Sequence, residues 1–193
     1  MKQNEVRFDP RISAAIRDRD LSALQQAIEA DPQQVRAFTP FAAGTWLHFA
    51  AREGNEKAVR YLLSRSIDVN VGDAREGRNA LCDACLGGHA EVAKLLLRSG
   101  ALIDVSDPVR NPLFSAIVGR SVECAKLLLE AGADTTVSYS GGSMEQMTAL
   151  AFAIERGEME IATMIARAET SSESEAQNKL DEARAVARRH NSD

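Results

Sequence analysis

The sequence predicts an all-α fold in which short helical hairpins stack into a solenoid. A related segment recurs four times along the 193 residues, at separations of 32 to 37 residues. The composition is 45% hydrophobic and only 5% aromatic. Because alanine and leucine suit helices, whereas sheets favour branched and aromatic residues, this balance indicates helices. Each segment also carries an apolar stripe at helical spacing. A single hairpin cannot bury that stripe, so several units must stack.

Each unit begins with a leucine in a short segment rich in alanine. The four leading leucines are Leu47, Leu81, Leu113 and Leu150. Seven residues later, three units have a glycine, which permits a left-handed turn between two antiparallel helices. The third unit has Arg120 there, with Gly119 one place early. A second helix follows, with the apolar pairs Leu62-Leu63, Leu96-Leu97, Leu128-Leu129 and Ile165-Ala166.

This pattern resembles the ankyrin repeat, in which T-P-L-H-x-A-A is followed by G-H, by a V-x-x-L-L helix and by G-A-D. The best matches are Leu47-His48-Phe49-Ala50-Ala51, Gly88-His89 and Gly132-Ala133-Asp134. The resemblance covers about residues 10 to 168. It implies an ankyrin-repeat solenoid of about five helix-turn-helix repeats with a C-terminal capping helix, working as a protein-binding module.

Both ends of the predicted solenoid depart from the pattern. Residues 1–168 are expected to form the ankyrin-repeat domain, with a degenerate first repeat at about 10–38 in which Arg19 replaces the turn glycine. The other repeats cover about 39–72, 73–104, 105–137 and 138–168. Residues 169–193 are expected to form a polar linker and a helix with Ala176, Leu180, Ala183 and Ala187 on one face. That helix covers the end of the stack, and a frayed tail is the alternative.

Charge and targeting signals narrow the class of function. The net charge is -5 and no run of lysine and arginine is present, so a nucleic-acid partner is not expected. No apolar run reaches the roughly 18 residues that a membrane span needs, and the N-terminus lacks the apolar stretch of a secretory signal. The three cysteines suggest no disulfide framework. We therefore expect a cytoplasmic protein with no membrane partner and no cofactor.

The resemblance also implies where a partner docks. In ankyrin proteins, the partner commonly contacts the concave face. The contacts are made by the hairpin loop before each leading leucine, called a finger, and by the residues just after the Ala-Ala pair. By position, these residues are Phe41, Trp46, Arg52, Glu53, Arg75, Glu76, Arg78, Leu86, Arg110, Tyr139, Met144, Glu145, Met147, Glu155 and Arg156. Asp73, Asp107 and Val118 hold further such positions. Arginine, methionine and aromatic residues are typical interface anchors.

Three features of this surface have two interpretations each. The finger arginines Arg75, Arg78 and Arg110 either pair with carboxylates of a partner or are solvated loop charges. The long last finger, residues 138–147, either serves binding or is a neutral length variation. Trp46 replaces the proline of the family pattern. It is either an exposed anchor or a filler against the imperfect first repeat, which is the role we expect for Phe38.

Cys82 and Cys85 have the C-x-x-C spacing of a redox pair or of half a zinc site. Zinc needs about four ligands, and only Cys124 and His89 lie nearby in the sequence. The two cysteines occupy the histidine and second alanine positions of the repeat, so we expect packing residues. A metal- or redox-active protein is the alternative. The repeat histidines, His48 and His89, are expected to hydrogen-bond neighbouring backbone.

The sequence thus predicts a non-enzymatic module that binds another protein as adaptor or inhibitor, with no catalytic, cofactor-binding or metal residue assigned. Small ankyrin proteins without further domains resemble immunity proteins, which neutralise a cognate toxin by occluding its active site. That is the alternative role, and the acidic balance suits a basic toxin. The partner and the oligomeric state are left open.

Overall fold

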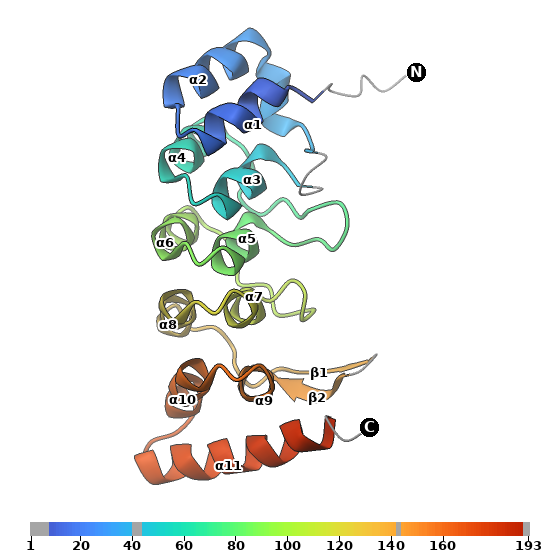
Figure 1. Cartoon of the computed structure of the whole chain (residues 1–193), viewed down its shortest axis with the longest axis vertical. Helices are drawn as coiled ribbons and strands as arrows, with labels where there is room; N and C mark the ends of the chain where they lie inside the picture. Colours follow the sequence, from blue (N-terminus) through green and yellow to red (C-terminus); the bar gives the residue numbers. More distant parts are fainter. Residues whose placement is uncertain (1–7, 40–43, 142–143, 191–193) are drawn as a thin grey trace.

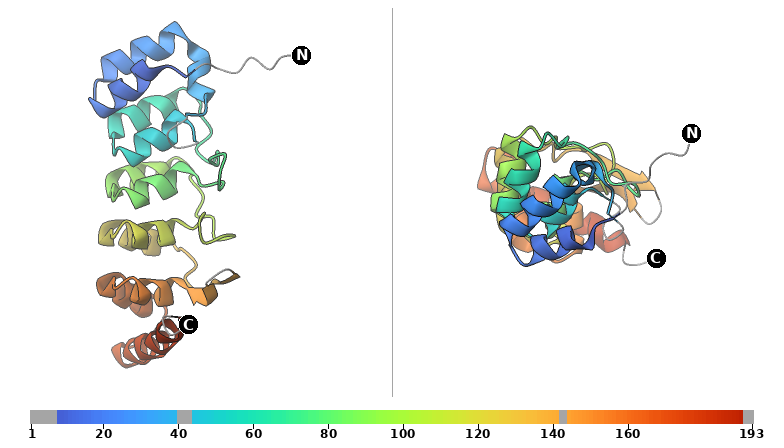
Figure 2. Two further views of the ribbon diagram at one scale, coloured as in Figure 1. Left: turned by 45° about the vertical axis from the view of Figure 1, so that its right-hand side comes forward. Right: turned by 90° about the horizontal axis from the view of Figure 1, so that it is seen from above.

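The molecule is an elongated stack of antiparallel helix pairs, one above another (Figure 1). The structure, a computed structural model, describes residues 8–39, 44–141 and 144–190, without the side chains of residues 144, 145 and 186–190. The loops that join successive pairs all project from the same side of the stack (Figure 2). This arrangement confirms the predicted all-α solenoid.

The described residues form five helix pairs, one short 3-10 helix, one two-stranded antiparallel sheet and a long last helix. In chain order the elements are α1 (Pro10–Arg17), α2 (Leu21–Ala30), η1 (Pro32–Arg36), α3 (Trp46–Arg52), α4 (Glu56–Ser64), α5 (Ala80–Leu86), α6 (Ala90–Arg98), α7 (Pro112–Val118), α8 (Val122–Glu130), β1 (Ser138–Gly141), β2 (Met144–Thr148), α9 (Ala149–Glu155), α10 (Met159–Ala168) and α11 (Glu173–His190).

Side-chain caps explain where most of these helices begin. The side chains of Asp20, Asn55, Asn79, Ser121 and Thr148 each accept a hydrogen bond from the backbone N–H three residues later. Such a cap satisfies one of the helix's unpaired N–H groups and contributes about 0.5–2 kcal/mol. Before α1 and α7, an Asp or Asn cap is followed directly by proline, which has no N–H to satisfy.

The turn between the two helices of a pair has a left-handed residue in the same place in every pair. Gly54, Gly88 and Gly157 fill it with φ of 62°, 74° and 76°. Arg19 and Arg120 adopt the same conformation with φ of 58° and 55°, although a side chain there costs about 1–2 kcal/mol. The turn therefore keeps its register without glycine.

Gly119, one place before that turn, has a different purpose. A Cβ atom added to it would lie only 2.5 Å from the carbonyl oxygen of Leu86. The glycine thus allows the end of α7 to approach the end of α5 closely.

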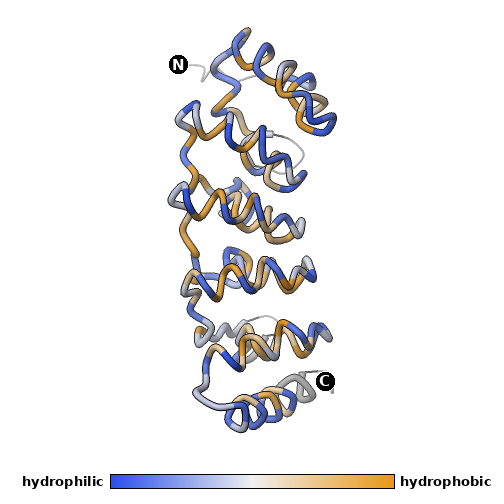
Figure 3. Tube along the Cα trace, turned by 90° about the vertical axis from the view of Figure 1, so that its left-hand side faces the viewer, coloured by the Kyte–Doolittle hydropathy of each residue, from blue (hydrophilic) through white to orange (hydrophobic). Residues whose placement is uncertain are grey.

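The core follows the predicted apolar stripe. Leu62, Leu96 and Leu128 are each 0% exposed, on α4, α6 and α8. Apolar and polar segments alternate along the helices, as Figure 3 shows. We call the first helix of each pair the inner helix and the second the outer helix. Each outer helix contacts the outer helices of the neighbouring pairs, and each inner helix contacts the inner helices of those pairs. Every pair inside the stack therefore depends on both neighbours for burial.

The two ends of the stack are closed by the elements that depart most from the repeat. Apolar residues of the first pair, among them Ile12, Leu24 and Ile28, are buried. At the other end, α11 packs against α9 and α10 and buries Ala176, Leu180 and Ala183. The C-terminal capping helix is confirmed, while the side chain of Ala187 lies outside the described residues.

Asn55 provides a test of the coupling between pairs. Its Oδ1 accepts the N–H of Ala58 at 3.1 Å, and its Nδ2 donates to the carbonyl of Ile16, in the preceding pair, at 2.7 Å. Asn55→Ala removes the cap of the Ala58 N–H and the bond between pairs, while the Ile16 carbonyl keeps the N–H of Arg19 at 3.3 Å. We therefore expect the free energy of unfolding to fall by about 2 kcal/mol in urea titrations. Asp20→Ala removes a cap but no bond between pairs, and is expected to cost about 1 kcal/mol. Equal losses in both variants would contradict the coupling.

Candidate protein-binding groove

The inner helices α3, α5, α7 and α9 present equivalent positions toward the loops before them. We call the loops 67–79, 101–111 and 133–148 the fingers. Two residues after each leading leucine stand Phe49, Asp83, Ser115 and Phe152, and five residues after it stand Arg52, Leu86, Val118 and Glu155. Positions three apart lie on one helix face. Along the inner face, Leu86 and Val118 therefore stand between the charged residues Arg52 and Glu155.

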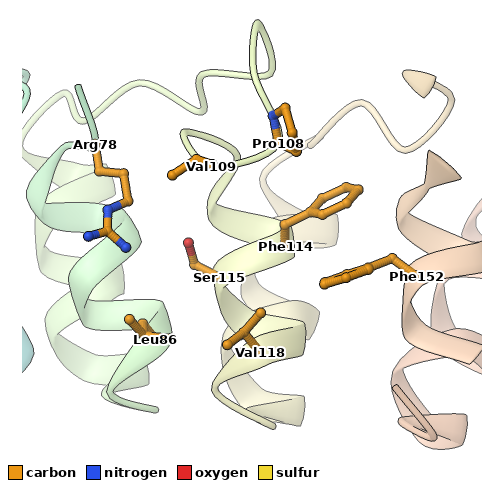
Figure 4. Close-up of a pocket in the computed structure, with 8 residues that line it drawn as sticks. All are labelled: Arg78, Leu86, Pro108, Val109, Phe114, Ser115, Val118 and Phe152. Atoms are coloured by element: carbon orange, nitrogen blue, oxygen red, sulfur yellow. The ribbon is translucent and has the colours of Figure 1, made fainter. Parts of the chain in front are cut away.

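An apolar cavity of about 330 Å³ opens at α5, α7 and α9 beneath the finger 101–111 (Figure 4). Its lining consists of Arg78, Leu86, Pro108, Val109, Phe114, Ser115, Val118 and Phe152. We call this cavity the groove. Val109 and Val118 are 39% and 40% exposed. Phe114 stacks on Phe152 with ring centroids 4.8 Å apart. Uncovered apolar surface in a concave site is typical of binding sites.

Arg78 supplies the one charge in the lining of the groove. Its Nε lies 3.2 Å from Asp73 Oδ2 and 3.3 Å from Glu76 Oε2. Burial lowers the pKa of Arg78, but the hydrogen bond to Asp73 and the nearby carboxylates more than offset this, so the net shift is upward. Asp73 is itself held by three backbone N–H groups of its own loop. The guanidinium is therefore a fixed, permanently protonated group.

A buried carboxylate lies beside the groove on α5. Asp83 is 2% exposed, and its Oδ1 lies 3.7 Å from Nη1 of Arg52. Burial raises the pKa of Asp83, and the charges of Arg78 and Arg52 offset this only in part, so the net shift is upward. This pair holds one cation, Arg52, at the inner face.

The two repeat histidines tie neighbouring pairs together, as expected. His48 Nε2 lies 2.9 Å from the carbonyl oxygen of Arg78, and His89 Nε2 lies 2.9 Å from that of Arg52. His48 Nδ1 accepts the backbone N–H of Thr45, so its Nε2 carries the proton that the carbonyl accepts. Both histidine rings therefore have structural roles. The hydrogen bond of His48 also positions the backbone of Arg78 at the rim of the groove.

A family profile described as ankyrin repeats, in three copies, matches residues 12–107. The chain belongs to the ankyrin-repeat family. The match begins within α1 and extends past α6, and the pairs α7–α8 and α9–α10 continue the ankyrin stack with the same inner and outer contacts. Ankyrin repeats are protein-interaction modules and are not themselves catalytic.

Several curated proteins share an ankyrin segment similar to this chain. The probable E3 ubiquitin-protein ligase XBOS32 of Oryza sativa subsp. japonica is 33% identical over 97 residues, which are 50% of this chain and 19% of that protein. XBOS33 of the same plant is 38% identical over 87 residues, 45% of this chain and 16% of that protein. The E3 ubiquitin-protein ligase hecd-1 of Caenorhabditis elegans is 36% identical over 93 residues, 48% of this chain and 3% of that protein. The chain thus spans about a fifth or less of these relatives.

Many of the predicted contact residues reach the surface of the ankyrin stack. Leu86 and Arg78 line the groove, and Arg156 lies over the ring of Phe152, 5.7 Å from its centroid. Other side chains that are at least partly exposed belong to Arg52, Glu53, Arg75, Glu76, Arg110 and Glu155. Phe41 lies outside the described residues, as do the side chains of Met144 and Glu145.

The finger arginines are not a uniform cluster. Arg110 packs against Gly77 of the preceding finger and lies 3.7 Å from Asp104. Arg78 is paired within its own finger and faces the groove, whereas Arg75 is exposed. Of the three arginines, only Arg78 therefore has a fixed position and lies beside the apolar residues of the groove.

The prediction that Trp46, Tyr139 and Met147 contact a partner is wrong. Trp46 is 0% exposed and stacks on Phe8 at 5.4 Å, so it fills the gap beside the first repeat. Phe38, for which we expected that role, is 51% exposed. Tyr139 and Met147 face each other across the β1–β2 hairpin and are 9% and 1% exposed.

The buried residues of this hairpin attach it to the preceding finger. The hydroxyl of Tyr139 donates to the carbonyl of Val105 at 2.9 Å and accepts from Nδ2 of Asn111 at 3.0 Å. Its ring meets Phe114 edge-on at 5.2 Å. The hairpin thus holds Phe114, and with it one wall of the groove.

Five groove residues were not among the positions predicted from the repeat: Pro108, Val109, Phe114, Ser115 and Phe152. The sequence contained a signal for Phe152. It stands two residues after its leading leucine, on the same helix face that carries Leu86 and Val118 in their own units. An aromatic residue at that position predicts an apolar inner face. Val109 and Pro108 belong to a finger, whose path the repeat pattern does not determine.

Cys82 and Cys85 are packing residues of α5, 1% and 0% exposed. The thiol of Cys82 donates to the carbonyl of Arg110 at 3.0 Å. Within residues 8–39, 44–141 and 144–190, no three of the described His, Cys, Asp or Glu side chains gather as a metal site requires. Within these same ranges, none of the helices has the length and apolar character needed to cross a membrane.

The thiols give a prediction about alkaline pH. Burial raises the pKa of Cys82 from 9.0 to about 12. In the unfolded chain this thiol ionises near pH 9, whereas the folded chain keeps its proton, so we expect stability to fall as the pH rises from about 9 toward 12. Urea titrations across this range measure it, and Cys82→Ala should flatten the fall. A native protein whose Cys82 and Cys85 react rapidly with a disulfide reagent at pH 8 would instead favour the redox alternative.

Proposed function

We propose that this protein binds a partner protein at the groove and at the exposed finger residues, and that it catalyses no reaction. The observation that carries the proposal is the groove itself, an apolar surface left uncovered between well-packed repeats. Val118 and Val109 remain two-fifths exposed there. Contiguous exposed apolar surface is costly in an isolated protein, and burial by a partner removes that cost.

The adaptor role has the better support of the two roles predicted from the sequence. The similar segments of the relatives belong to much longer chains named as E3 ubiquitin-protein ligases. A binding module in such a chain acts by bringing a partner to other machinery, and this argument is one of analogy. Inhibition by occlusion, including toxin immunity, stays a prediction. A cytoplasmic location belongs to the same proposal, supported by three free cysteines.

Photo-crosslinking in cells of the source organism tests the proposal. The full chain carries benzoylphenylalanine in place of Val118, and irradiation is expected to give a discrete protein adduct that mass spectrometry identifies. The matched control places the same group at Leu102, which is 64% exposed and does not line the groove. An adduct at Leu102 alone, or none at either position, would contradict binding at the groove. The identity of the partner separates adaptor from inhibitor.

A further inference from the structure

The lining of the groove has a simple chemistry that constrains its occupant. Six of the eight lining residues are apolar, one is Ser115, and one is the cation Arg78. None of the eight carries a carboxylate. The volume of about 330 Å³ lies at the low end of the range of roughly 300–1,000 Å³ for ligand sites. It suits the side chains of a peptide better than a large cofactor.

Arg78 has hydrogen-bonding capacity left for a ligand. Asp73 and Glu76 contact its Nε. Among the described residues, no acceptor forms a hydrogen bond with either of its Nη groups. Figure 4 shows the guanidinium in front of α5, at the end of the groove where Leu86 lies. The planar group therefore presents free N–H donors toward the groove, and a carboxylate is the acceptor that matches them best.

The apolar end of the groove lies on the far side of α7 from Arg78. The stacked rings of Phe114 and Phe152 lie there, and Val118 lies beside them on the face of α7 (Figure 4). Neighbouring packed helices lie about 8–10 Å apart, and an extended chain advances about 3.3 Å per residue. A carboxylate at Arg78 and an apolar side chain between α7 and α9 would thus be roughly three to six residues apart in an extended peptide.

We propose that the groove binds an extended segment of the partner with two features. A large aliphatic or aromatic side chain lies against Val118, Phe114 and Phe152, and a carboxylate three to six residues away binds Arg78. This inference rests on the proposed function and specifies the chemistry of the partner. The carboxylate of the partner accepts the free N–H groups of Arg78, and its apolar side chain covers the exposed Val118.

The test is a selection from a displayed library of random twelve-residue peptides on the immobilised full chain. Synthetic copies of the enriched peptides are then titrated by fluorescence polarisation against the native chain and three variants. Arg78→Gln should weaken binding by roughly tenfold to a hundredfold, and Val118→Asp should weaken it at least as much. Arg98→Gln, which removes an exposed arginine of the outer helix α6, should leave it unchanged.

A second form of each peptide has its Asp or Glu replaced by Asn or Gln. It separates the loss of the ion pair with Arg78 from any change that Arg78→Gln causes in the shape of the finger 67–79. The amide peptide should bind the native chain and the Arg78→Gln variant equally well. Enriched peptides without a carboxylate, or acidic peptides indifferent to Arg78→Gln, would overturn the inference. If no peptide is enriched while a folded protein cross-links at Val118, the inference fails and the proposed function stands. If the Val118 adduct is absent as well, both fail.

Discussion

Replacing Leu96 with alanine is expected to lower the free energy of unfolding by about 3–5 kcal/mol. Leu96 is 0% exposed on α6, and α6 contacts both α4 and α8. The substitution removes three buried carbon atoms and leaves a cavity in the middle of the stack, where both neighbouring pairs lose contacts. In a stack stabilised by nearest-neighbour contacts, the loss weakens the two interfaces together.

Leu102→Ala is the matched control for this prediction. Leu102 is 64% exposed, so the same change of side chain is expected to alter the free energy of unfolding by no more than about 0.5 kcal/mol. Both variants are measured by urea titration followed by circular dichroism. Similar stabilities of the two variants would mean that the helical stripe does not form the core.

The repeated elements could be predicted because spacing alone determines them. The leading leucines and the apolar pairs fix two helices per unit, and the burial of Leu62, Leu96 and Leu128 follows from the same spacing. Even the turns without glycine kept their register. Arg19 and Arg120 adopt the left-handed conformation because packing of the flanking helices dictates the turn and outweighs its strain.

The groove could be predicted only in part, because its lining comes from both repeated and irregular segments. Leu86 and Val118 followed from their place in the repeat. The predictions for Trp46 and Tyr139 were wrong because the repeat pattern gives a residue's place in the chain but not the direction of its side chain. The hairpin turns Tyr139 inward to bond Val105 and Asn111, and a loop of that kind has no fixed period to reveal it.

Val118→Asp is expected to weaken binding of the partner by roughly 30-fold to 100-fold. The carboxylate would lie among Leu86, Phe114 and Phe152, where a partner's apolar side chain would strip it of water. The fold should tolerate the change, because Val118 is the last residue of α7 and is 40% exposed. The effect should therefore appear in affinity and leave thermal stability almost unchanged.

The measurement that tests the account most directly is the dissociation constant of the cross-linked partner for the native chain, Val118→Asp and Leu102→Asp. The two variants place the same charge on two exposed apolar residues, one in the groove and one outside it. The account predicts that Val118→Asp loses at least 30-fold in affinity while Leu102→Asp binds like the native chain. Equal affinities for all three proteins would show that the partner docks elsewhere on the stack.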